Sequence, residues 1–184
     1  GVAGVSTADV VLLSSQTATS DASISFASGI TSTYGEYIFK FYNMGPETNN
    51  VDFSVNFRDG STAYDAPKTT TFFRPIHSET GASDFEYRTD QDLAEGTGVQ
   101  NLGYGTGNGA DQGIAGELHL FNPASTTYVK HFYATTQGYG HSNNYSRNHF
   151  IAGYCNTTSA IDGVQFTFSS GDFDGTIKLW GVKN

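Results

Sequence analysis

The sequence predicts an all-β protein, an antiparallel β-sandwich of the jelly-roll type with about nine or ten strands. Three observations lead to this prediction. Short stretches in which apolar and polar residues alternate recur along the chain, and this is the period of a half-buried strand. Turn signals rich in Gly, Asn and Asp separate these stretches, and no amphipathic helix pattern lies between them. Aromatic and β-branched residues, which suit a pleated surface, are abundant.

The strand candidates can be justified in chain order from this alternation. The clearest is 51–57, where Val51, Phe53, Val55 and Phe57 alternate with polar residues. The segment 36–42 is apolar on both faces, as expected for a strand covered on both sides. The remaining candidates are 9–13, 22–26, 70–74, 117–121, 127–134, 149–155, 164–168 and 176–182.

Two glycine-rich segments, 90–116 and 135–148, do not fit this pattern. The first contains eight glycines, and we expect both to be long loops, which are often functional or mobile. No shift in composition marks a linker, so we predict a single domain over residues 1–184, with 1–10 as an extended arm.

Composition and charge exclude several classes of protein. The net charge of −9 argues against nucleic-acid binding, which needs clustered Lys and Arg. No apolar stretch approaches the ~18–20 residues of a membrane span, so no membrane partner is expected. The single cysteine, Cys155, cannot form an intrachain disulfide, and its apolar surroundings predict a packed, unreactive thiol.

No motif points to catalysis or to a cofactor. The stretch "GYGTGNG" lacks the Lys and the following helix of a phosphate-binding loop, and no G-x-S-x-G motif is present. The five histidines lack metal-ligand spacing; two of them, His119 and His131, lie on candidate strands and are expected to face outward. Asp172 and Asp174 have the spacing of calcium ligands, but "GDFDG" is foremost a hairpin turn, so they are only weak candidates for a cation site.

The segment 135–148 is the best candidate for a recognition surface. Tyr combined with Asn, Ser and Gly is typical of adaptable binding loops and also suits sugar rings, although an ordinary turn-rich loop has the same composition. The candidate residues are Tyr139, His141, Asn143, Asn144, Tyr145 and Arg147.

The single tryptophan lies near the end of the sequence, in the second strand of a predicted terminal hairpin. Alternation places Ile177 and Leu179 toward the core and Trp180 on the outer face, beside Lys178 and Val182. We expect Trp180 to be covered by a long loop such as 90–116 or by a neighbouring subunit.

The stretches "FNPASTTYVKHF" (121–132) and "SSGDFDGTIKLWG" (169–181) give the chain a resemblance to a known class. The sequence resembles small virion-associated structural proteins of marine tailed bacteriophages. The resemblance implies a location on the virion surface, either on the head as a decoration protein or on the tail as a fibre domain. It also implies binding to a major capsid or tail protein and brings no catalytic residues. Such proteins are usually symmetric homo-oligomers.

Three functions therefore stay open. The first is a non-enzymatic virion structural protein, and the alternative is a carbohydrate-binding, receptor-recognition module of a phage fibre that binds a surface glycan. An enzyme is the least favoured, because no catalytic constellation is visible.

Overall fold

A computed structural model describes residues 9–142 and 144–183 of the chain. The described residues form twelve antiparallel strands and no helix, which confirms the predicted all-β class. The strands are β1 (Val10–Asp21), β2 (Ser23–Phe26), β3 (Glu36–Pro46), β4 (Val51–Arg58), β5 (Lys68–Ser78), β6 (Ser83–Tyr87), β7 (Gln100–Thr106), β8 (Ile114–Phe121), β9 (Lys130–Tyr139), β10 (Tyr145–Cys155), β11 (Gly163–Phe168) and β12 (Phe173–Val182).

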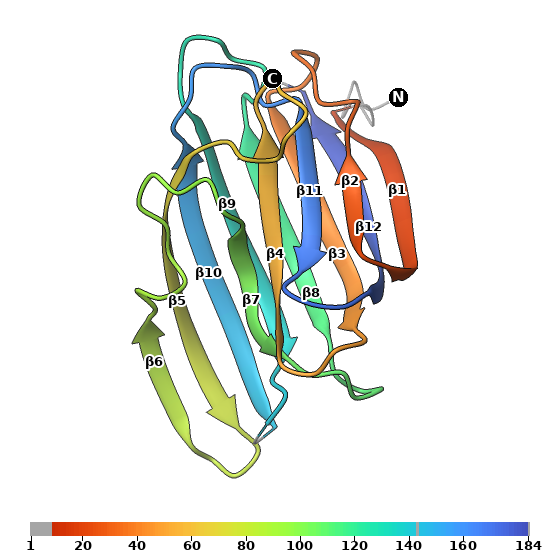
Figure 1. The fold of residues 1–184 in the computed structure, drawn as a ribbon, viewed down its shortest axis with the longest axis vertical. Helices are drawn as coiled ribbons and strands as arrows, with labels where there is room; N and C mark the ends of the chain where they lie inside the picture. Colours follow the sequence, from red (N-terminus) through yellow and green to blue (C-terminus); the bar gives the residue numbers. More distant parts are fainter. Residues whose placement is uncertain (1–8, 143, 184) are drawn as a thin grey trace, which may run out of the picture.

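The strands form two sheets that pack face to face (Figure 1). The large sheet has the order β1-β12-β3-β8-β9-β10-β5-β6, and the small sheet has the order β2-β11-β4-β7. Two hairpins, β5–β6 and β9–β10, lie wholly in the large sheet. Without them the sheets have the orders β1-β12-β3-β8 and β2-β11-β4-β7, which is the arrangement of an eight-stranded jelly roll, and the two hairpins widen its large sheet.

Neither glycine-rich segment is one continuous loop, so the prediction of two long loops is only partly right. Residues 90–116 consist of a connection up to Val99, β7, the connection 107–113 and the start of β8, and residues 135–148 contain the end of β9 and the start of β10. Gly103 of β7 shows the physical reason, because a Cβ there would clash with Ile114 Cδ1. A glycine can therefore mark a close approach between strands rather than a loop.

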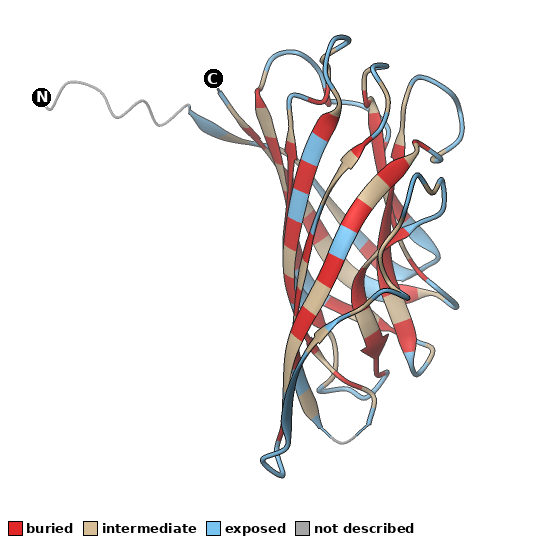
Figure 2. Cartoon of the chain, turned by 90° about the vertical axis from the view of Figure 1, so that its left-hand side faces the viewer, coloured by how far each residue is buried: buried red, intermediate tan, exposed pale blue. Residues whose placement is uncertain are grey.

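The core lies between the small sheet and the strands of the large sheet that face it. Along these strands buried residues alternate with more exposed ones (Figure 2). Phe166 of β11 is fully buried at the centre, with ring centroids 5.3 Å from Phe39, 5.2 Å from Phe41 and 6.0 Å from Phe53. Contacts between aromatic rings of this geometry add to the free energy gained by burying their apolar surface.

The large sheet extends beyond the small one. Strands β10, β5 and β6 lie outside β7, the edge strand of the small sheet (Figure 1). Their inner side is covered instead by β7 and the segment that precedes it, where the hydroxyl of Thr70 accepts from the amide of Leu93 and donates to Gln100 Oε1. The buried side chains here include charged ones, among them Lys68 and Arg74.

Candidate functional site

The residues predicted as a recognition surface in 135–148 do not form one surface. Tyr139 points to the outer face of the large sheet, whereas Tyr145 lies on the opposite side, in register with Ser78. Asn144 lies in the β9–β10 turn with a positive φ of 46°, and its amide donates to Glu79 Oε2. The ring of His141 contacts Gly105 O through Nδ1. Asn143 lies outside the described residues.

Arg147 is not a surface residue, which corrects its assignment to that surface. Its exposed fraction is 6%, and Nη1 donates to the carbonyl oxygens of Tyr104 at 2.8 Å and Gly105 at 2.9 Å. Burial, followed by repulsion from Arg74, lowers the pKa of the guanidinium. Arg147 thus ties β10 of the large sheet to β7 of the small one, and it cannot contact a ligand outside.

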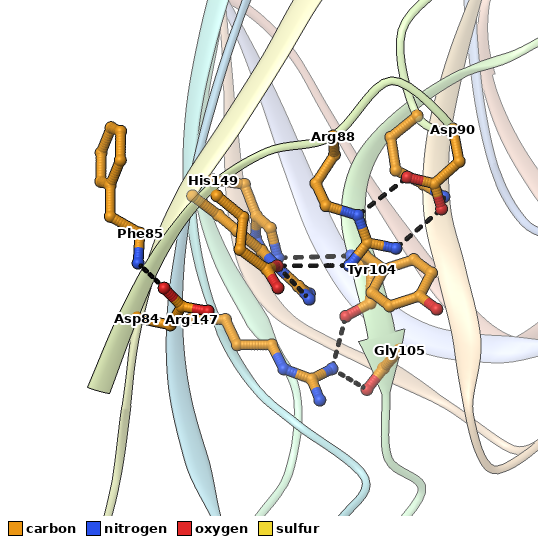
Figure 3. A network of polar contacts seen from close by, with 11 residues as sticks. Asp84, Phe85, Arg88, Asp90, Tyr104, Gly105, Arg147 and His149 are labelled. Carbon is orange, nitrogen blue, oxygen red and sulfur yellow. Dashed lines mark hydrogen bonds and ion pairs between the residues drawn. The ribbon is translucent and has the colours of Figure 1, made fainter. Parts of the chain in front are cut away.

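Arg147 belongs to a polar cluster around the ring of Tyr104 (Figure 3). The guanidinium carbons of Arg74 and Arg88 lie 4.9 Å and 4.5 Å from the centroid of that ring. Arg74 pairs with Glu86 at 2.8 Å, and Arg88 donates to both carboxylate oxygens of Asp90. The bidentate bond from Arg88 holds the pKa of Asp90 well below its usual range.

His149 lies beneath this cluster as a neutral imidazole. Thr136 Oγ1 donates to Leu102 O, so His149 Nδ1 donates to Thr136 Oγ1, and Nε2 accepts from the amide of Tyr104 (Figure 3). Burial, with the charges of Arg74 and Arg147 nearby, lowers the pKa of His149 to about 3. Because the ring stays neutral, sealed from solvent and fully hydrogen-bonded, it is not placed to exchange protons with a substrate. We interpret the whole cluster as the polar interior of the overhang, which is the part of the large sheet (β10, β5 and β6) that extends beyond the small sheet.

The other side chains that the sequence analysis considered as reactive or cation-binding groups have structural roles. Cys155 is buried, as predicted, and burial raises the pKa of its thiol to about 12. Asp174 Oδ1 accepts from the amide of Ser20, while Asp172 accepts through its backbone carbonyl from Glu47. Within residues 9–142 and 144–183, no group of three or more His, Cys, Asp or Glu side chains is arranged to hold a metal ion.

The outer face of the large sheet is a broader candidate. The described chain places no third layer over it, and six of the eight large hydrophobic residues that are exposed point outward from its strands. Aromatic rings extend across it, since Phe73 stacks on Phe150 at 5.0 Å and contacts Phe85 at 5.6 Å. The six exposed residues are Val10, Leu12, Tyr42, Phe85, Tyr87 and Tyr133.

Trp180 lies on this outer face, with Ile177 and Leu179 buried beneath it, as the alternation predicted. It is in register with Leu12 on one side and Ile38 on the other. The segment 90–116 does not cover it, because that segment packs against β5 and then forms strands of its own. Cover by a neighbouring subunit stays a prediction.

His119 also lies on the outer face but is less exposed than expected. Its ring stacks on Tyr133 at 4.5 Å, with Nδ1 close to Glu36 Oε1 and Nε2 3.2 Å from Glu117 Oε1. Lys40 pairs with Glu117 at 3.4 Å. These polar residues thus pair with one another in the middle of the face. His131 is exposed, as predicted.

A hollow of about 880 Å³ opens at the end of the sandwich where the amide of Lys183 donates to Asp9 O. Eight of its eleven lining residues come from 121–131, and the others from the β2–β3 and β10–β11 connections. Tyr128 at its rim has an exposed fraction of 74%, the highest among the large hydrophobic residues of the described chain that are exposed. The sequence assigned residues 127–129 to a strand, but β9 begins only at Lys130, so Tyr128 lies in a loop.

Comparisons with known proteins do not assign the chain to a family. No protein-family model matches the sequence, and no curated protein matches it. A solved structure from Bacteroides ovatus, described as a structural-genomics protein of unknown function, is 8% identical, with a TM-score of 0.33. The match covers 57% of this chain and 45% of that one, so the chain spans less than half of its length. A likeness at this level carries no argument.

The described residues contain no helix of the length and apolar character needed to cross a membrane.

Proposed function

We propose that the protein is a non-enzymatic structural protein of a virion that docks on a capsid or tail subunit through the outer face of its large sheet. The observation that carries this proposal is the uncovered outer face with its exposed aromatic and aliphatic side chains. Monomeric proteins rarely expose a broad apolar surface unless it binds something. The resemblance of the sequence to virion-associated proteins supports the choice of a virion subunit as the partner.

The size of the face fits a protein interface. Adjacent strands lie about 4.8 Å apart, and residues advance about 3.4 Å along a strand. Eight strands with about seven residues each therefore present about 34 × 24 Å, or roughly 800 Å². This is about the area that each partner contributes to a stable interface of standard size.

The charge of the face also fits a protein partner. In the middle of the face the positive charges of Lys40 and Lys178 balance the negative charges of Glu36 and Glu117. These residues lie on the outward positions of 176–182 in β12 and on the positions paired with them in the neighbouring strands. The chain as a whole carries −9, so its excess charge lies elsewhere. Few charges and many aromatic rings are typical of the buried centre of an interface. We therefore expect the facing patch of the partner to be largely apolar.

The proposal is tested by measuring whether the recombinant protein binds particles. The protein should be detectable in purified particles from the source of the sequence, and recombinant protein should rebind to particles depleted of it. Tyr133→Lys removes an exposed ring from the middle of the face and adds a charge that a bound partner would have to bury, and we expect at least about a thirtyfold loss of affinity, as for an interface hot spot. Thr62→Lys adds the same charge in the exposed β4–β5 connection and serves as the matched control.

Three results would contradict the proposal. The protein could be absent from particles, or Tyr133→Lys could bind them as tightly as Thr62→Lys does. Sedimentation could also show a stable dimer of the free protein that Tyr133→Lys dissociates, and the occupant of the face would then be a second copy.

A further inference from the structure

We propose that the hollow at the end of the sandwich, around Tyr128, binds a neutral oligosaccharide. This inference does not rest on the docking role, because the hollow is built mainly from connecting loops beside the outer face. Its volume of about 880 Å³ lies within the roughly 300–1,000 Å³ that is typical of small-molecule sites.

The loop that carries Tyr128 is held in place by its own hydrogen bonds. Ser125 Oγ accepts from the amides of Thr127 and Tyr128, and the amide of Ser125 donates to Asn122 O. The loop is also anchored to its neighbours, since the amide of Asn122 donates to Gly35 O and Pro123 O accepts from the amide of Ile161. The backbone that carries Tyr128 is thus fixed in a solvent-exposed position, and a ligand that stacks on the ring does not have to order the loop.

The lining of the hollow excludes charged ligands. None of its eleven residues is Asp, Glu, Lys or Arg, although the chain has a net charge of −9. A phosphate, a sulfate or a uronic acid would therefore meet no opposite charge here. The complementary ligand is neutral.

The polar groups of the lining distinguish a sugar from an apolar ligand. Tyr34, Phe121 and Tyr128 provide aromatic surface, and Asn122 and Thr127 are short side chains that can donate and accept hydrogen bonds. A lipid or another apolar molecule would bury these polar groups without partners, which costs free energy. A sugar ring has an apolar C–H face for the aromatic rings and hydroxyl groups for the amide and hydroxyl side chains.

A second hollow makes the site longer than one sugar ring. It has a volume of about 420 Å³, shares Phe121 and His131 with the first, and continues past Tyr133 and Tyr154. The two hollows thus adjoin at Phe121 and His131, and aromatic side chains line both. We therefore expect a hexasaccharide to bind more tightly than the corresponding monosaccharide.

Isothermal titration calorimetry of the free protein tests this inference. The probes are maltohexaose, cellohexaose, mannohexaose and chitohexaose, with glucose, mannose and N-acetylglucosamine as the matched monosaccharides. We expect at least one hexasaccharide to bind at millimolar concentration or below. Tyr128→Ala should weaken that binding at least about tenfold, which corresponds to about 1.4 kcal/mol, whereas Tyr128→Phe should keep most of it.

Tyr42→Ala is the matched control, because Tyr42 is an exposed tyrosine on the outer face that does not line either hollow. It should leave saccharide binding unchanged. The inference is overturned if no neutral hexasaccharide binds, if only acidic saccharides bind, or if Tyr128→Ala binds as the parent does. Particle binding by Tyr128→Ala is measured separately, so a failure here is distinguishable from a failure of the docking role.

Discussion

Two interior regions of the sandwich are built from the same strand pattern but filled with different chemistry. Where the two sheets face each other, the inward positions hold aromatic rings around Phe166. Where β10, β5 and β6 extend beyond the small sheet, the inward positions hold Arg147, His149 and Arg74, gathered near Tyr104.

The difference shows what a second sheet contributes. Facing sheets bring apolar side chains from both sides, so the backbone hydrogen bonds stay within each sheet and the rings only need to fit together. At the overhang the cover is an irregular segment and the edge of β7, whose carbonyl groups need donors. Arg147 reaches two of these carbonyls, those of Tyr104 and Gly105, and the interior there is polar because the edge of β7 is not paired with another strand.

The largest effect is expected from the aromatic region. Phe166→Ala removes a fully buried ring that contacts three other rings described above, and it should lower the free energy of unfolding by about 3–5 kcal/mol. Urea denaturation measures this loss. Phe150→Ala, which removes a ring stacked on Phe73 on the outer face, should cost much less. Equal losses would mean that the core of the fold does not lie between the sheets.

A smaller effect is expected at the overhang. Arg147→Met keeps an apolar stem but removes the hydrogen-bond donors to Tyr104 O and Gly105 O, so the free energy of unfolding should fall by about 3 kcal/mol. Arg88→Met is the control, since Arg88 contacts the same ring but forms its ion pairs with the partly exposed Glu86 and the exposed Asp90. It should cost about 1 kcal/mol or less. If Arg88→Met is the more damaging change, Arg147 does not provide the link between the sheets.

The aromatic region could be predicted from the sequence, because its signal is local. The alternation in 51–57 placed Phe53, Val55 and Phe57 on a buried face, and the structure buries all three. The placement of Ile177 and Leu179 beneath Trp180 follows from the same period of two.

The overhang could not be predicted in this way. The hydrogen bond from Arg147 joins residues 43 positions apart, and nothing in the neighbouring sequence distinguishes this arginine from an exposed one. The glycines of β7 were similarly misleading, because the reason for Gly103 is Ile114 on another strand. The hollow around Tyr128 was missed for a related reason: the run 127–134 has the composition of a strand, but Ser125 bonds its first residues into a loop.

The smallest of the expected effects concerns pH and follows from His149. In the folded protein its pKa is about 3, whereas an unfolded chain binds a proton on this ring below about 6.5. The unfolded state therefore holds more protons as the pH falls, and the free energy of unfolding should decrease below about pH 6.5. Between pH 7 and pH 5 we expect the free energy of unfolding to fall by about 2 kcal/mol because of this residue.

Urea denaturation of His149→Gln should show a flatter dependence of the free energy of unfolding on pH over that range, because Gln does not titrate. His131→Gln, which removes an exposed imidazole, should follow the profile of the parent. Parallel profiles for the parent and His149→Gln would show that His149 is not held neutral. A charged imidazole could not accept the hydrogen bond from the amide of Tyr104, so the hydrogen-bonding of the polar interior described above would then be wrong.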